Sequence, residues 1–148
     1  MLSILYFILP FSHDEVVHSK GTIIDKIWGN NEQKFAQLKT LYTYMMIHPG
    51  KKLNFMGNEL GEYKEWDEKV ALGWNILKYP IHDSFHKFMI RLNEVYKTYP
   101  CMYEQDYGMD GFEWLVVDDR AQSVFAIERK GTDGSSLIAV MNFTGNKI

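Results

Sequence analysis

The order of its candidate elements constrains this chain most, because the character of the sequence changes near residue 101. Short apolar runs alternate with helical patterns in the first part, at residues 4–9, 30–48, 53–56 and 84–99. Three strand-like runs separated by turn-forming residues follow, at residues 112–117, 123–127 and 137–143. Alternating strands and helices favour an α/β sheet or barrel, whereas consecutive short strands favour an antiparallel meander. The sequence therefore predicts an α/β part followed by an all-β part.

Local signals delimit the two helices. Asn30 is a plausible N-cap, and Gln33 three residues later completes a pattern like the capping box. Pro49 and Gly50 end this first helix. The second helix is expected from about Ser84 to Tyr99, before Pro100. Both stretches carry apolar residues at helical spacing, so each helix should bury one face.

Composition excludes several classes of function. The chain has 148 residues, with 16 Lys+Arg against 19 Asp+Glu and a net charge of −3. This mild acidity argues against a nucleic-acid partner, which needs clustered basic residues. The single cysteine, Cys101, excludes an intramolecular disulfide framework and a Cys-rich zinc site. The length alone suggests one domain.

No segment predicts a membrane partner or secretion. Residues 1–9 are apolar, but they lack a basic n-region and a small-residue cleavage site. They are also far shorter than the ~20 apolar residues of a spanning helix. We therefore expect a buried strand here and a cytoplasmic protein.

The segment Ser12–His18, which contains His13 and Asp14, is the strongest chemical signal, and it admits three interpretations. A carboxylate beside an imidazole at a strand end suits a carbohydrate site, because glycosidic cleavage passes through a positively charged transition state. The His13-Asp14 pair also resembles metal ligands of phosphohydrolases of the HD type, although those ligands lie on helices. The third interpretation is structural: Ser12 or Asp14 caps the next element.

Polar groups after the second apolar run form a weaker candidate. Glu59 follows the run at 53–56, as Asp14 follows the run at 4–9. In a (β/α)8 barrel, side chains just past the strand ends face the active site. A solvated turn is the alternative. Trp66 and Trp74 further on could stack on sugar rings or pack the loop onto the fold.

Several motifs together resemble those of bacterial glycogen branching enzymes, members of the α-amylase superfamily. The resemblance lies in five stretches that span nearly the whole chain after residue 8: Leu9–His18, Gln33–Gln37, Pro49–Glu59, Glu65–Trp66 and Gly111–Asp119. It is less clear at Leu72–Trp74. The combination is highly specific.

The resemblance implies a fold: the last two βα units of a (β/α)8 TIM barrel, followed by the start of an antiparallel, all-β C-terminal domain. Residues 1–100 would then be the C-terminal part of the catalytic barrel, and residues 101–148 the beginning of the β domain. Tyr6–Pro10 and Leu53–Met56 would be the seventh and eighth barrel strands. By this reasoning the chain is too short to hold either domain whole.

The resemblance also implies chemistry. Branching enzymes cleave an α-1,4 linkage of α-glucan and transfer the chain to a 6-hydroxyl, with retention and without a cofactor or metal. Asp14 matches the catalytic carboxylate that stabilises the transition state, and His13 matches the histidine that hydrogen-bonds the sugar. Glu59 is a weaker candidate for substrate binding.

The departures from the family limit the expected activity. The nucleophile and the general acid/base should lie on earlier strands, so we expect this fragment alone to be inactive. Ser19 stands where the family usually has glycine. A non-catalytic module that binds glucan or a partner chain is the alternative function. Unpaired strand edges and exposed helix faces also predict self-association of the fragment.

Overall fold

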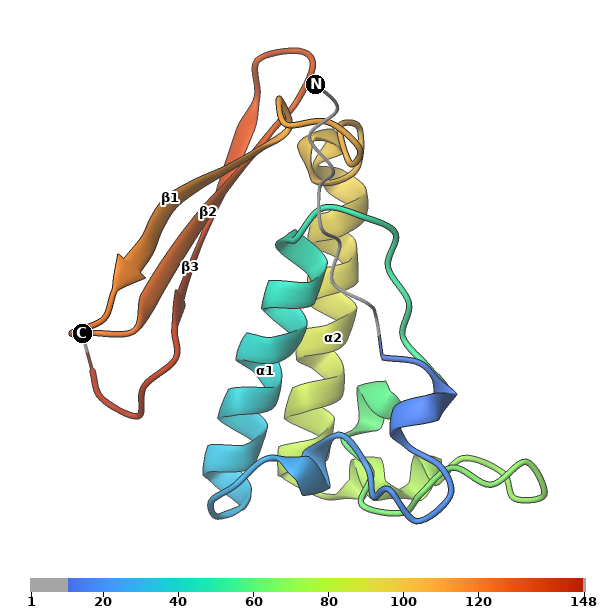
Figure 1. Ribbon diagram of the computed structural model, residues 1–148. Helices are drawn as coiled ribbons and strands as arrows, with labels where there is room; N and C mark the ends of the chain where they lie inside the picture. The colour runs from blue at the N-terminus through green and yellow to red at the C-terminus, as the bar shows by residue number, and fades with distance from the viewer. Residues whose placement is uncertain (1–10, 148) are drawn as a thin grey trace. The chain divides into compact units, whose positions relative to one another are not determined.

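The computed structural model describes residues 11–147, in which two helices and a three-stranded sheet are joined by loops and short 3-10 turns (Figure 1). The chain divides into two compact units, each with its own core. The sheet unit comprises Thr40–Lys52 and Asn93–Ile148 within the described residues. The loop unit comprises Pro10–Lys39 and Leu53–Leu92, again where described. Each helix contributes residues to both units.

Helix α1 spans Asn31–Ile47, and its predicted capping box is confirmed. The Gln33 backbone N–H donates to Asn30 Oδ1 at 3.0 Å, and the Asn30 N–H donates to Gln33 Oε1 at 3.0 Å. These reciprocal bonds satisfy two amides that helix geometry would otherwise leave unpaired. The helix ends just before Pro49, as predicted.

Helix α2 spans Pro80–Thr98, so it begins before the predicted start at Ser84. Proline fits the first helical position because its missing N–H would have no helical partner there and its fixed φ suits the helix. The Asp83 N–H donates to the Tyr79 carbonyl at 3.1 Å, which continues the helical pattern up to this start. The apolar periodicity begins only at Phe85, and the first turn was therefore missed.

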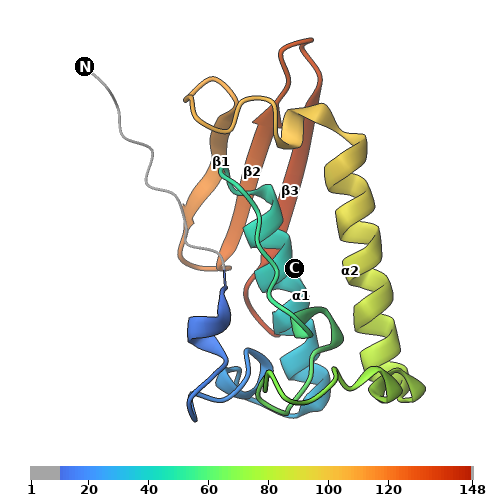
Figure 2. The same cartoon turned by 90° about the vertical axis from the view of Figure 1, so that its right-hand side faces the viewer.

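The predicted meander is confirmed in the sheet unit. Strands β1 (Phe112–Asp119), β2 (Val124–Lys130) and β3 (Ser136–Asn142) pair antiparallel in the order β1-β2-β3 (Figure 2). The core of this unit comprises Ile47, Cys101, Met102, Ile127 and Met141. One face of the sheet therefore covers the end of α1 and the turn at Pro100–Met102.

The two predicted strands of the α/β part have different outcomes. The run at 4–9 lies outside the described residues. Leu53–Met56 is not a strand: it forms no ladder with any described segment, and the Asn58 N–H bonds back to the Phe55 carbonyl at 3.0 Å in a turn. An apolar run becomes a strand only when a neighbouring strand accepts its backbone hydrogen bonds. The described residues offer it no such neighbour.

The loop unit has a core of aromatic rings. The ring centroid of Phe35, on α1, lies 4.9 Å from His82 and 5.6 Å from Phe85, both on α2. His82 is buried, and its Nδ1 donates to the Leu60 carbonyl at 2.8 Å. These contacts fix residues 58–61, and with them the start of the loop that carries Trp66.

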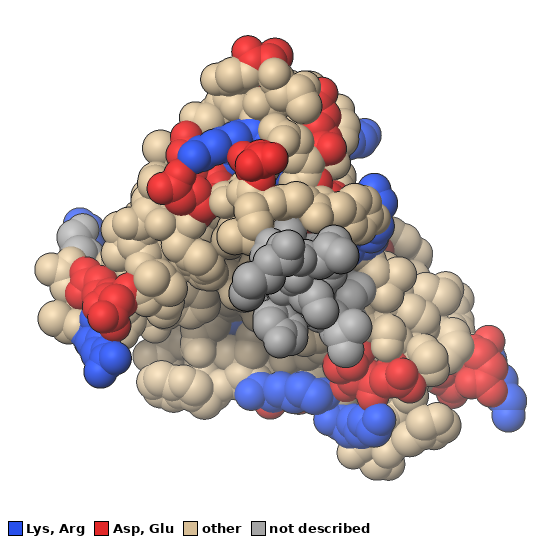
Figure 3. Space-filling model, turned by 45° about the horizontal axis from the view of Figure 1, so that its top comes forward, with Lys and Arg blue, Asp and Glu red and all other residues tan. Residues whose placement is uncertain are grey.

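Charged residues of both signs lie interspersed on the face drawn in Figure 3. This agrees with the nearly balanced composition of the chain. None of the described helices combines the length and the apolar character needed to cross a membrane.

Candidate functional site

Asp14 lies in a one-turn 3-10 helix, His13–Glu15, that its neighbours cap. Ser12 Oγ accepts from the Asp14 N–H at 3.2 Å, and the Ser12 N–H donates to Glu15 Oε2 at 2.6 Å. The capping interpretation is therefore correct for Ser12, with Glu15 as its partner. Because these two side chains supply the cap, the carboxylate of Asp14 is not used in it.

The side chains of Asp14 and His13 are exposed and adjacent. His13 Nε2 lies 3.2 Å from Asp14 Oδ1, and the two side chains are 58% and 69% exposed, respectively. Because both groups keep most of their hydration, their pairing contributes little to stability. Both side chains are therefore accessible to a ligand.

Lys26 organises the loop that follows Asp14. Its ammonium group donates to four backbone carbonyls, at distances of 2.6–3.4 Å: Glu15, Lys20, Gly21 and Thr22. Lys20 in turn donates to the Asp14 carbonyl at 2.7 Å. An ammonium has three rotatable donors and suits such a ring of carbonyl oxygens. The sequence did not reveal this role, because a surface lysine in a loop carries no local signal.

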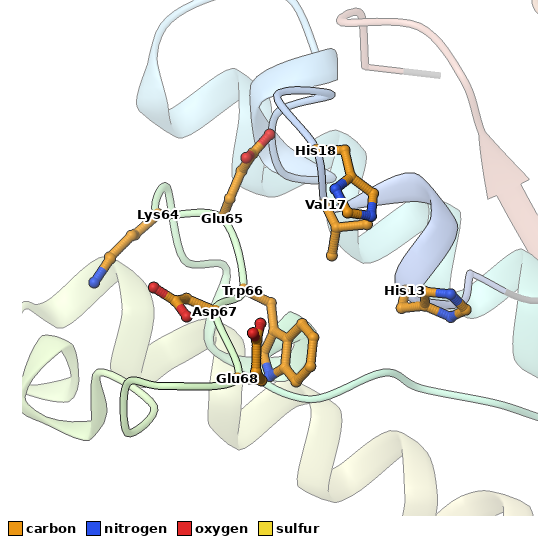
Figure 4. A pocket seen from close by; sticks show the side chains of 8 residues that line it. All are labelled: His13, Val17, His18, Lys64, Glu65, Trp66, Asp67 and Glu68. Carbon is orange, nitrogen blue, oxygen red and sulfur yellow. The ribbon is translucent and has the colours of Figure 1, made fainter.

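A pocket of about 560 Å³ opens between this loop and residues 64–68. Figure 4 shows His13, Val17 and His18 on one side of it and Trp66 with its neighbours on the other. The full lining is His13, Val17, His18, Lys64, Glu65, Trp66, Asp67 and Glu68. An indole, two imidazoles and several carboxylates around an open pocket can stack on a sugar ring and hydrogen-bond its hydroxyls.

Aromatic contacts connect the two sides of the pocket. The ring of Phe55 lies 6.0 Å from that of His13 and 5.1 Å from that of Trp66. Trp66 is thus both a packing residue and a pocket wall, so the packing interpretation is confirmed and stacking on a sugar ring stays a prediction. Trp74 does not line this pocket: it is 52% exposed and lies against His86, 5.9 Å between ring centroids.

Glu59 lies apart from the Asp14 pair. It belongs to the 3-10 turn Asn58–Leu60 and accepts a hydrogen bond from Asn54 Nδ2 at 2.8 Å. Among residues 11–147, no hydrogen bond or ion pair joins Glu59 to His13 or Asp14, and Glu59 does not line the pocket. The structure therefore brings His13 and Asp14 together but does not add Glu59 to them.

Metal ligation has no counterpart in the described part of the chain. There, no three His, Cys, Asp or Glu side chains converge closely enough to hold a metal ion. His13 and Asp14 are adjacent, but two ligands from neighbouring residues do not make a coordination site.

Comparison with known proteins finds relatives that are named 1,4-alpha-glucan branching enzymes. It is 48% identical over 139 residues to the 1,4-alpha-glucan branching enzyme GlgB of Aquifex aeolicus, covering 93% of this chain and 22% of the relative. The enzyme of the same name from Rhizobium meliloti is 48% identical over 93% of this chain and 19% of its own length. The Geobacillus stearothermophilus enzyme is 46% identical over 96% of this chain and 22% of its own length. No protein-family model matches the chain.

The resemblance drawn from the sequence is thus confirmed: the chain is homologous to a segment of bacterial 1,4-alpha-glucan branching enzymes. It spans about a fifth of the length of the relatives that it matches.

Proposed function

We propose that this chain forms part of the glucan site of a cytoplasmic 1,4-α-glucan branching enzyme. The whole enzyme would cleave an α-1,4 linkage and transfer the released chain to a 6-hydroxyl. One observation carries the proposal: His13 lines the pocket that Trp66 walls, and it pairs in solvent with Asp14, which is not itself a lining residue. The names and the identity of the relatives support the same substrate class.

In this proposal the Asp14 carboxylate stabilises positive charge that develops on the sugar in the transition state. His13 donates a hydrogen bond to a hydroxyl of the same sugar. Glu59 supports the substrate-binding loop through Asn54. Retaining transfer also needs a nucleophile and a proton donor, which we assign to parts of the enzyme outside this chain.

We further propose that residues 1–100 supply the last two βα units of a (β/α)8 barrel and that residues 101–148 begin a β domain. Helices α1 and α2 would be barrel helices, and the meander would open the second domain. In that setting residues 53–56 would gain the strand neighbours that the described residues lack.

A chimeric enzyme tests the proposed role of Asp14. In the Aquifex aeolicus enzyme, the matching segment is replaced by this chain, and branching of amylose is followed by iodine staining and by the appearance of α-1,6 linkages. We expect the chimera to branch amylose and Asp14→Asn to lower its kcat by about 100-fold or more, because an electrostatic stabiliser of the transition state is lost.

Asp83→Asn is the matched control. Asp83 lies on α2 and pairs with Lys87 at 2.7 Å, away from the pocket lining, so this variant should keep the activity of the chimera. A folded chimera without activity, or an Asp14→Asn variant as active as the control, would contradict the proposal. The purified chain alone should show no turnover of amylose in a reducing-end assay.

A glucan-binding module without catalysis is the second candidate, and the position of Trp66 in the pocket favours it. Saturable binding of amylose by the purified chain would support this function. Binding should be lost in Trp66→Ala, because the stacking surface disappears, and kept in Asp14→Asn. The same Asp14→Asn change in the chimera then separates a binding role from a catalytic one.

A further inference from the structure

Two loops that are distant in the sequence meet at the carboxylate of Glu65. Glu65 Oε2 accepts from the Ser19 N–H at 3.1 Å, and its Oε1 accepts from the Gly21 N–H at 2.5 Å. Both oxygens are used, each by a backbone amide of the loop that follows Asp14. Hydrogen bonds to a carboxylate are stronger than those between neutral groups, so this is a firm connection between the loops.

The backbone of the 18–21 loop needs such support. His18, Ser19 and Gly21 all have positive φ, at 59°, 63° and 74°. Residues with a Cβ adopt this region only at a cost, so the surrounding contacts must hold them there. Lys26 donates to backbone carbonyls of the loop, and Glu65 accepts from its backbone amides. At Gly21 the carbonyl is bound by Lys26 and the amide by Glu65.

We call the Glu65 carboxylate, with the Ser19 and Gly21 amides that it binds, the Glu65 clamp. The clamp lies next to the pocket. His18 is one residue before Ser19 and lines one side of the pocket, and Trp66 is one residue after Glu65 and lines the other. Figure 4 shows Glu65 beside Trp66, across the pocket from His13. Because the Glu65 carboxylate accepts from the Ser19 and Gly21 amides, it connects the two walls through their chain neighbours.

We propose that Glu65 is a positioning residue, which fixes the width of the pocket between His18 and Trp66 so that an α-glucan chain fits. This inference rests on the proposed function for the identity of the ligand. Glutamine at this position would keep one acceptor oxygen but present an N–H₂ group to the second amide. One of the two bonds would then be lost without a change in side-chain length.

The test uses the purified chain, labelled with ¹⁵N and ¹³C, and maltoheptaose as the probe. In the unsubstituted chain, scalar couplings across the hydrogen bonds should connect the Ser19 and Gly21 amide nitrogens to the Glu65 carboxyl carbon. In Glu65→Gln, at least one of these two amide protons should move upfield. Affinity for maltoheptaose should fall roughly tenfold, because binding must then order the pocket walls that the two bonds hold in the free chain.

Glu62→Gln is the matched control, since Glu62 lies on the same loop, does not line the pocket and bonds neither amide. It should leave both amide shifts and the affinity as they are. If Glu65→Gln does not fold, Glu65→Asp takes its place; its shorter side chain should lengthen both bonds and weaken binding similarly.

Each outcome separates the two proposals. Shifted amides with unchanged maltoheptaose affinity would overturn the positioning role and leave the proposed function standing. Absent couplings in the unsubstituted chain would show that the clamp does not exist. A folded chain that does not bind maltoheptaose would overturn this inference and count against glucan binding by the chain itself.

Discussion

Arg129 is fully enclosed in the sheet unit, and all three of its nitrogens are bonded. Its Nε donates to the Gly111 carbonyl at 3.0 Å, one terminal nitrogen to the Ile47 carbonyl at 2.9 Å, and the other to Asp106 Oδ1 at 2.8 Å. The Arg129 side chain is 0% exposed and that of Asp106 is 1% exposed. A planar guanidinium presents its donors in fixed directions and can bind three separated acceptors at once. A lysine ammonium is a single compact group and could not reach all three.

Removing this cation should destabilise the sheet unit strongly. Arg129→Met leaves the Asp106 carboxylate buried without its cation and removes the side-chain donor to the Ile47 carbonyl, while the Gly111 carbonyl still accepts from the Lys130 N–H at 3.1 Å. We expect a loss of about 3–5 kcal/mol in the free energy of unfolding, measured by urea denaturation. Arg120→Met is the control, because Arg120 pairs with Asp118 in solvent, with side chains 89% and 77% exposed. Equal stability of the two variants would contradict this account.

Ser19 shows how one departure from the family acquires a physical meaning. The resemblance to branching enzymes leads us to expect glycine at this position, and Ser19 has a φ of 63°, where glycine carries no Cβ penalty. Ser19→Gly should therefore stabilise the chain by about 0.5–1 kcal/mol, measured by thermal unfolding. Ser84→Gly, within α2, should have the opposite sign, since glycine weakens a helix interior. Destabilisation by Ser19→Gly would contradict the expected relief of strain.

At this scale the sequence predicts some site residues and not others. His13 and Asp14 are neighbours in the chain, so their pairing is a local property and could be anticipated. Glu65 acts on Ser19 and Gly21 across a long stretch of sequence, and one acidic residue among several in residues 62–68 has no distinguishing pattern. Only the folded loops show which carboxylate is used.

At the scale of elements, the cap of α1 allows a test of whether residues close in sequence stabilise the first turn of the helix. Asn30→Ala removes the side chain that accepts the Gln33 N–H. We expect a loss of about 1 kcal/mol in stability and a frayed first turn, visible as faster amide hydrogen exchange at residues 31–34. Asn30→Asp is the control: its carboxylate can still accept this bond and should keep the protection. Unchanged exchange in Asn30→Ala would show that tertiary contacts alone hold the turn.

Elements with local signals were predicted well, and those that need distant partners were not. The α1 cap and the turns between β1, β2 and β3 depend on residues close in sequence, so their patterns suffice. Residues 53–56 have the composition of a strand, yet a strand exists only where a second segment pairs with it. A strand at residues 53–56 would therefore need a pairing partner that the described residues do not supply.

For the molecule as a whole, one face of the sheet bears on the expected self-association. The strands pair so that one face covers the core, while the other carries exposed aliphatic side chains. The register places Val116, Ile138 and Val140 on this outer face, where they are 37–68% exposed. Glu113, Glu128 and Lys130 form ion pairs on the same face, so the three aliphatic side chains are an apolar patch on a partly charged surface.

We expect the isolated chain to self-associate through this face. Sedimentation velocity should show a species larger than the monomer that grows with concentration, and Val140→Lys should shift it towards the monomer because burying the charge is costly. Met109→Lys is the control, since Met109 is similarly exposed but precedes the sheet. A monomer at all concentrations would contradict the expectation.

The position of Cys101 has a practical consequence. It is the single thiol of the chain, 1% exposed in the core of the sheet unit, where burial raises its pKa. A maleimide in solution can reach the Cys101 thiol only when that unit opens, so the rate of alkylation measures how often the unit opens. No native cysteine has to be removed before a second, engineered thiol reports on the pocket, and the slow and fast phases of labelling would distinguish the two sites within one sample.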